Sequence, residues 1–165
     1  MNKTIIGIII ATIAFLGIVW IARPDSQTSN TASILQNSGG TLGVEETSFD
    51  FGAISMAAGI VKHAFKIKNT SNEPITIGKM YTSCMCTTAI LMTGDKQFGP
   101  YGMPGHGFIP KINAAMNPGE EATVEIVFDP AAHGPAGVGR IQRTITIENN
   151  AGQSLELGFT ALITP

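Results

Sequence analysis

Both cysteines of the chain lie in the stretch Ser83-Cys84-Met85-Cys86-Thr87, with a single methionine between them. In an extended strand, residues two apart project to the same side, and their Cα atoms lie about 6.6 Å apart. That separation is near the upper limit of about 6.8 Å for a disulfide, so a bridge would need a kink in the chain. Two thiolates can instead hold a metal ion across the wider gap, with bonds of about 2.3 Å to zinc.

Other soft or imidazole ligands are present at a distance in the sequence. The segment GPYGMPGHG contains Met103 and His106, and the segment DPAAHGPAGVG contains His133. Thiolate and thioether ligands together with imidazole favour Cu(I). The sequence therefore predicts a candidate metal site made of Cys84, Cys86, His106, Met103 and His133.

Two other interpretations of the cysteines stay open. Free cysteine is commonly a small, buried core residue, and packing alone accounts for a pair beside Ser83 and Thr87. A redox role needs a cysteine whose pKa is lowered by a helix start or by cations. The nearest cation in the sequence is Lys79, which gives that role little support. His133 also has a local explanation, as the last residue of a single helical turn that begins at Asp129.

Motifs of conventional active sites are absent from the sequence. It contains no G-x-S-x-G elbow, no G-x-x-x-x-G-K-[ST] loop and no H-E-x-x-H pair. We therefore expect no catalytic residues, no organic cofactor and no enzymatic activity. The net charge of −2 and the pI of about 5.9 offer no basic stripe to a nucleic-acid backbone, so we expect no nucleic-acid partner.

The N-terminal part of the chain reads as a membrane anchor followed by a linker. Residues 5–22 carry no charge and are flanked by Lys3 and Arg23, and a run of this length can span the hydrocarbon core. A cleaved signal peptide is the alternative, although its apolar region is usually shorter. We expect an anchor over residues 1–23 and a flexible linker over residues 24–47, rich in Ser, Thr, Asn, Gln and Gly. The remaining domain would then lie outside the cytoplasm, tethered to the cell membrane by a single pass.

From residue 48 onward, apolar and polar residues alternate with period two. Such alternation indicates strands with one buried and one exposed face. It is clear in four segments: 60–68, 122–128, 141–148 and 155–163. Turn residues separate them, as in Asn117-Pro118-Gly119. About seven strands are expected over residues 48–165, arranged as an all-β, immunoglobulin-like antiparallel sandwich.

Several short motifs together resemble one bacterial family, the domain of unknown function 1573. They are Phe49-Asp50-Phe51-Gly52-Ala53-Ile54, Phe65-Lys66-Ile67-Lys68-Asn69-Thr70, Ser83-Cys84-Met85-Cys86-Thr87, Pro118-Gly119-Glu120 and Phe128-Asp129. The resemblance implies an immunoglobulin-like fold and export from the cytoplasm, and it implies no particular reaction. The chain departs from the family pattern at Met85, where glycine is usual, and in the Gly-rich segment over residues 93–117.

These observations favour a non-catalytic binding or scaffold module, held at the membrane and presented outside the cytoplasm. Its partner would be a protein or an envelope glycan, recognised by the sandwich edges and by the loop over residues 93–117. The alternative is a Cu(I)-binding protein that uses Cys84 and Cys86 with Met103 or His106.

Overall fold

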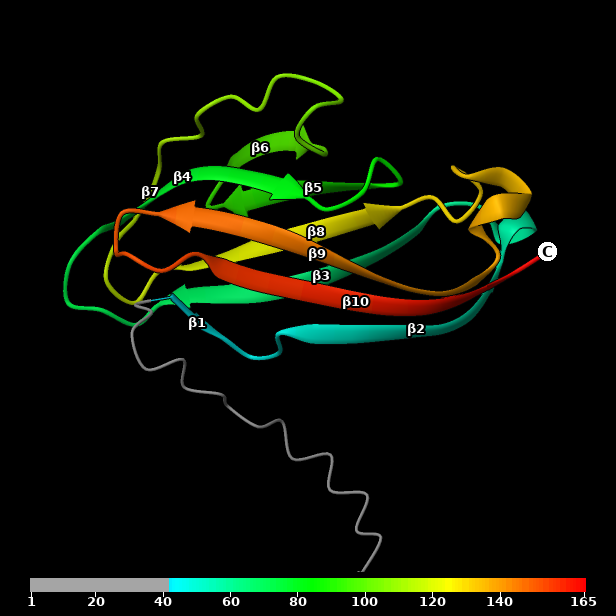
Figure 1. Ribbon diagram of the computed structural model, residues 1–165. Coiled ribbons are helices and arrows are strands. Elements are labelled where there is room, and N and C mark those ends of the chain that lie inside the picture. The colour runs from blue at the N-terminus through cyan, green and yellow to red at the C-terminus, as the bar shows by residue number, and fades with distance from the viewer. Residues whose placement is uncertain (1–41) are drawn as a thin grey trace, which may run out of the picture. The chain divides into compact units, whose positions relative to one another are not determined.

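Alternating apolar side chains build two β-sheets that pack face to face in the computed structural model, which describes residues 42–165 (Figure 1). Sheet A has the strand order β1-β3-β8-β5-β6, and sheet B has the order β2-β10-β9-β4-β7. The strands are β1 Leu42–Val44, β2 Ser48–Ser55, β3 Val61–Asn69, β4 Ile75–Thr82, β5 Thr87–Thr93, β6 Lys96–Tyr101, β7 Ala114–Met116, β8 Glu121–Phe128, β9 Gly139–Asn149 and β10 Leu155–Thr164. Two short 3₁₀ helices, η1 Met56–Ala58 and η2 Gly134–Gly137, complete the described elements.

The buried faces of the two sheets form one core. In β5, β8 and β10 every second side chain is buried in it, as the alternation predicts. Phe65, Leu91 and Val124 come from sheet A, while Ile145 and Phe159 come from sheet B, and all are fully buried. The predicted all-β sandwich is thus confirmed.

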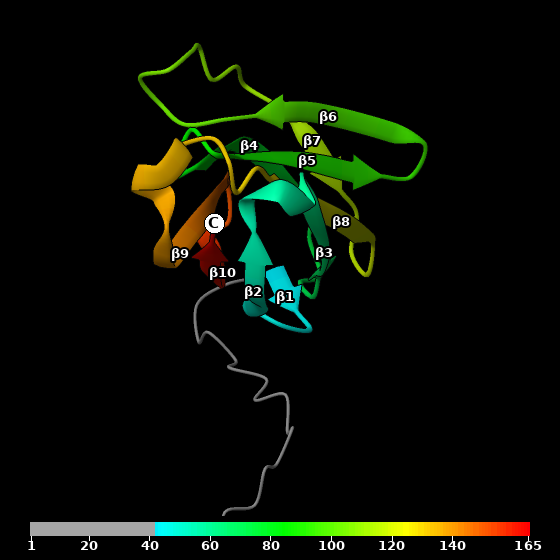
Figure 2. The same ribbon diagram turned by 90° about the vertical axis from the view of Figure 1, so that its right-hand side faces the viewer.

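Most connections carry the chain from one sheet to the other. Only β5–β6 and β9–β10 join neighbouring strands of the same sheet. Figure 2 views the sandwich from a second side, with β5 and β6 paired at one edge. Because the faces of packed sheets lie about 10 Å apart, each crossing requires a turn that reaches across the end of the sandwich.

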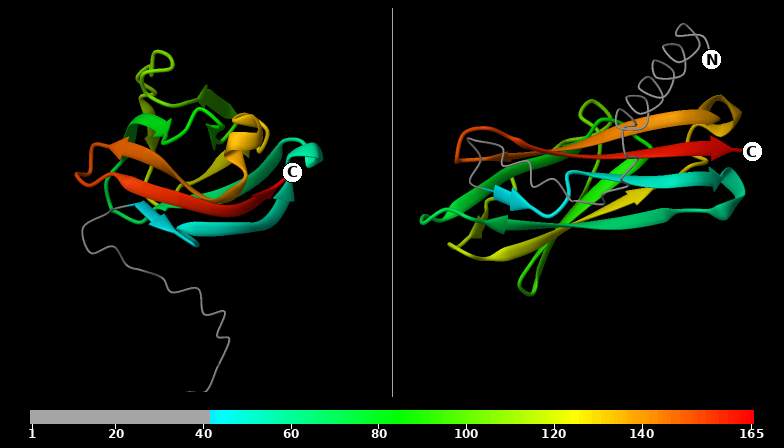
Figure 3. Two further views of the ribbon diagram at one scale, coloured as in Figure 1. Left: turned by 45° about the vertical axis from the view of Figure 1, so that its right-hand side comes forward. Right: turned by 90° about the horizontal axis from the view of Figure 1, so that it is seen from below.

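The structure has more strands than the sequence predicts, and not all pairs are antiparallel. Strand β2 lies at an edge of sheet B and pairs in parallel with β10 (Figure 3). Leu42–Val44, which we expected in the linker, form β1 and pair with residues 67–69 of β3. The segment over residues 93–117 is not a continuous loop, since it contains β6 and β7. The prediction missed these pieces because three-residue strands and a Gly-Pro-containing strand carry little alternation.

The predicted anchor over residues 1–23 and most of the predicted linker lie outside the described residues. Among residues 42–165, no helix is long and apolar enough to cross a membrane.

One buried polar side chain joins two turns at the end of the sandwich opposite the cysteines. The Asn69 amide donates hydrogen bonds to the carbonyls of Glu73 at 2.8 Å and Met116 at 2.9 Å. Its oxygen accepts from the Ser71 N–H and hydroxyl. The side chain is fully buried and its hydrogen-bonding groups are satisfied, so the cost of burying them is offset.

The neighbouring turn between β7 and β8 depends on a carboxylate. Glu120 accepts a hydrogen bond from the backbone N–H of Asn117 at 2.8 Å and another from the Thr93 hydroxyl at 2.8 Å. These bonds, above all the one from the Asn117 backbone, hold the pKa of the Glu120 carboxyl below its usual value near 4.5. A group with a lowered pKa stabilises the folded state when it is ionised.

We expect Glu120→Gln to lower the free energy of unfolding at pH 7 by less than about 1 kcal/mol, since the carboxylate lies near the surface. The difference from the wild type should be full above pH 4.5 and should shrink as the pH falls through the lowered pKa of the folded state. Urea denaturation at several pH values measures this, with Glu156→Gln, an exposed position on β10, as the control. A difference that stays constant from pH 7 to pH 3 would contradict the proposed role.

Candidate functional site

The segment Ser83–Cys86 carries the chain from β4 in sheet B to β5 in sheet A. It is held to both sheets by backbone hydrogen bonds. The Ser83 N–H donates to the Thr144 carbonyl of β9 at 2.9 Å, and the Asp129 N–H, just after β8, donates to the Cys86 carbonyl at 2.9 Å. The Thr87 N–H donates to the Cys84 carbonyl at 3.2 Å, which closes a turn. The cysteines therefore lie on a tight turn between the two sheets. The sequence had suggested an extended strand at this position.

This turn brings the two cysteines close enough to form a disulfide. Their Cα atoms are 5.3 Å apart, well below the roughly 6.6 Å of an extended strand. Cys84 and Cys86 are bonded to each other, and the Cys86 N–H also donates to the Cys84 sulfur at 3.2 Å. Residue 85 points outward, and Met85 is 53% exposed. The kink that the sequence argument required for a bridge is supplied by the crossing turn.

A buried hydroxyl supports the turn from inside. The Thr82 Oγ1 lies 3.0 Å from the Cys84 carbonyl oxygen and 2.9 Å from the Thr87 carbonyl oxygen, with the side chain only 1% exposed. The Cys84 carbonyl also accepts the Thr87 N–H, so the hydroxyl adds a buried hydrogen bond that ties the two ends of the turn together.

Each sulfur of the disulfide has its own polar partner. The His133 Nε2 lies 3.2 Å from the Cys84 sulfur. The Arg143 Nε donates to the Cys86 sulfur at 3.4 Å, and the Thr87 hydroxyl lies 3.6 Å from the same atom. Both residues are buried, with Cys84 8% exposed and Cys86 3% exposed, so the residue beside His133 is the more exposed of the two.

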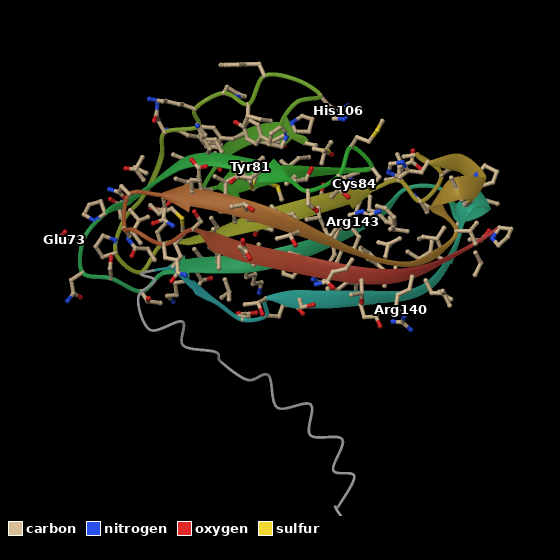
Figure 4. The ribbon with its side chains drawn as sticks, viewed as in Figure 1. Glu73, Tyr81, Cys84, His106, Arg140 and Arg143 are labelled. Atoms are coloured by element: carbon tan, nitrogen blue, oxygen red, sulfur yellow. A yellow bond between two sulfur atoms is a disulfide. The ribbon has the colours of Figure 1, made fainter. Side chains whose placement is uncertain are left out.

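Arg143 is the site residue that sequence reasoning missed. It lies on β9 between Ile141 and Ile145, at an inward position of the alternation. A charged side chain at an inward position needs partners, and those of Arg143 are the Cys86 sulfur and the Gln142 carbonyl. Figure 4 shows Arg143 on the side of the molecule where Cys84 lies. The signal was therefore present in the sequence as a break in an otherwise apolar face. Arg140, on the same strand, is exposed and lies away from the cysteines in Figure 4.

His133 reaches the site from the connection between β8 and β9. The predicted turn is present over residues 130–133, and Gly134 follows it with a positive φ of 54°. The 3₁₀ helix η2 then begins at Gly134, with His133 as its N-cap. The turn before it is stabilised by the Asp129 carboxylate, which accepts from the Ala131 N–H at 2.9 Å. The exposed imidazole is thus placed over Cys84.

The structure divides the predicted metal ligands into two groups. Within residues 42–165, one set of three or more Cys, His, Asp or Glu residues converges: the ligand atoms of Cys84, Cys86 and His133 lie within 4.8 Å of one another. His106 is not in this set and lies on the loop after β6 (Figure 4). It forms a turn in which its N–H donates to the Met103 carbonyl. A ligand role for Met103 stays a prediction.

Residues 42–96 match the family described as protein of unknown function, DUF1573. The match agrees with the resemblance that the motifs indicated over this segment, and it includes the Cys84–Cys86 turn. A comparison with curated protein sequences finds no match.

Among solved structures, a protein of unknown function from Porphyromonas gingivalis W83 is similar with a TM-score of 0.55 and 19% identity, over 74% of this chain and 46% of that chain. The secreted serine protease VesC from Vibrio cholerae gives a TM-score of 0.48 and 12% identity, over 75% of this chain and 24% of that chain. The ASH / PapD-like domain 7 of human CEP192 gives a TM-score of 0.45 and 13% identity, over 75% of this chain and 85% of that chain. The chain spans less than half of the first two proteins, and the first likeness shows the fold alone.

We expect Thr82→Val to lower the free energy of unfolding by about 0.5–1.5 kcal/mol, because it removes the buried hydroxyl that hydrogen-bonds within the turn. Thr82→Ser keeps the hydroxyl and should lose less. Urea denaturation of the oxidised chain compares the two variants. Equal stability of the valine and serine variants would show that the hydroxyl does not support the turn.

Proposed function

We propose that this chain, with its DUF1573 segment, is a redox module whose Cys84–Cys86 pair exchanges with external thiols. The observation that carries the proposal is the hydrogen bond from Arg143 to the Cys86 sulfur. It supplies the cation whose absence near the motif counted against a redox role in the sequence. The proposal goes beyond the non-catalytic module that the sequence predicts.

The geometry supports a definite order of exchange. An external thiolate attacks the sulfur of Cys84, the more exposed residue of the pair, the disulfide breaks, and Cys86 leaves as a thiolate. Arg143 and the Thr87 hydroxyl are in place to stabilise that negative charge by hydrogen bonds. The Cys84 sulfur is then held in a mixed disulfide with the incoming thiol.

A second external thiolate completes the reaction. It attacks the incoming sulfur of the mixed disulfide, and Cys84 leaves as a thiolate beside His133, which lies close enough to exchange a proton with it. Two external thiols have then become one disulfide, while Cys84 and Cys86 have gained two electrons and two protons. The exposed Met85 offers an apolar contact beside the pair to a thiol carried on a polypeptide.

The wild-type disulfide should equilibrate with glutathione, and Arg143→Gln should shift that equilibrium toward the disulfide by about threefold to tenfold. The reason is that a charge-assisted hydrogen bond to the thiolate, of about 1.5–3 kcal/mol, is lost near the surface, where part of it is screened. The chain is incubated in glutathione buffers of varied ratio, the thiols are trapped by alkylation, and mass spectrometry gives the reduced fraction. Arg140→Gln on the same strand is the matched control.

A binding or scaffold module is the alternative that this experiment decides. It predicts a disulfide that resists glutathione while the protein is folded, and equal behaviour of the Arg143 and Arg140 variants. In that case substitution of the cysteines would alter only stability, and the function would lie with a protein or glycan partner.

We further propose that the domain lies outside the cytoplasm, tethered by residues 1–23. A disulfide persists in oxidising compartments, which agrees with the export implied by the family resemblance. Protease added to cells without an outer barrier should release the domain while a cytoplasmic marker stays intact. Protection of the domain in that assay would contradict the location.

A further inference from the structure

We propose that the reduced pair, together with His133, forms a binding site for a single Cu(I) ion. The inference rests on the proposed function only in that the disulfide must be reducible. It adds a ligand class to the same site and selects His133, rather than His106, as the third ligand.

The convergence of three donor atoms carries the proposal. The two sulfurs and an imidazole nitrogen lie within 4.8 Å of one another, and His133 Nε2 is already 3.2 Å from the Cys84 sulfur. When the bond between the sulfurs is opened, small side-chain rotations can place an ion between the three atoms. The backbone hydrogen bonds from Ser83 and Asp129 hold the turn in place during this change.

The chemistry of the donors selects a soft, low-coordinate ion. Thiolates favour Cu(I) over harder ions. A structural zinc site takes four protein ligands, and the converging set within residues 42–165 contains three. Two thiolates and one Cu(I) carry a net charge of −1, which the Arg143 guanidinium beside Cys86 can compensate.

His133 is the exposed member of the site, while both cysteines are buried. An incoming ion would therefore approach from the side of His133. Reduction of the disulfide by a thiol supplies two electrons and two protons, and binding of Cu(I) then displaces those two protons from the thiols. The disulfide form has no thiolate ligands, so the ion would be held in the reduced state alone.

The test is a competition titration of the full chain with the Cu(I) chelator bicinchoninate, under anaerobic conditions and after reduction with a phosphine. We expect one ion per chain, with affinity lowered at least about tenfold by His133→Ala, since even loss of an outer-shell partner has that effect. His106→Ala, on the loop after β6, is the matched control and should bind as the wild type. X-ray absorption on the loaded protein should show two sulfur neighbours and one nitrogen neighbour.

Three results would overturn the assignment. They are no binding by the reduced wild type, binding that is unaffected by His133→Ala, and equal binding by the oxidised chain. His133→Ala changes an exposed residue, so loss of folding does not obscure the result, and circular dichroism verifies this. Exchange with glutathione is measured on metal-free protein, so failure of the copper site and failure of the redox proposal are separate outcomes.

Discussion

The crossing from β4 to β5 is the constraint on which the site depends. Between Thr82 and Thr87 the chain must leave one sheet and enter the other, and both ends of this segment are already fixed by strand pairing. The chain makes this crossing in a turn, which is held by hydrogen bonds from the Ser83 and Asp129 N–H groups. An extended path would separate the cysteines more widely. Proximity of the two sulfurs is therefore a consequence of sandwich topology and not of the Cys-x-Cys spacing alone.

The same sheet topology also places the polar partners of the two sulfurs beside them. Arg143 comes from β9, which pairs with β4, and His133 comes from the connection that follows β8, which pairs with β5. Arg143 thus meets the Cys86 sulfur from a strand of sheet B, and His133 meets the Cys84 sulfur from the connection between the sheets. In the proposed exchange, this asymmetry assigns Cys84 as the attacked sulfur and Cys86 as the leaving one.

Periodicity in the sequence was sufficient to predict the sandwich, because a strand with one wet face requires alternation. The short strands β1 and β7 escaped the prediction since three residues carry too little pattern, and the parallel pairing of β2 with β10 is a long-range contact with no local signal. For the site, Cys84, Cys86 and His133 were candidates from residue type, but their convergence depends on the crossing turn. Arg143 could have been found as a charge on an apolar face, although its partner could not.

The hydrogen bonds that hold the crossing turn do not involve the sulfurs, except for the one from the Cys86 N–H to Cys84. The backbone hydrogen bonds and the Thr82 hydroxyl therefore hold the turn whether or not the two sulfurs are bonded to each other. Breaking or forming the bond between the two sulfurs would therefore change the chemistry of the pair but leave the backbone of the turn almost unchanged. A partner that distinguishes the two states would have to contact the surface around Met85 and His133 directly, because the conformation of the rest of the sandwich would be the same in both.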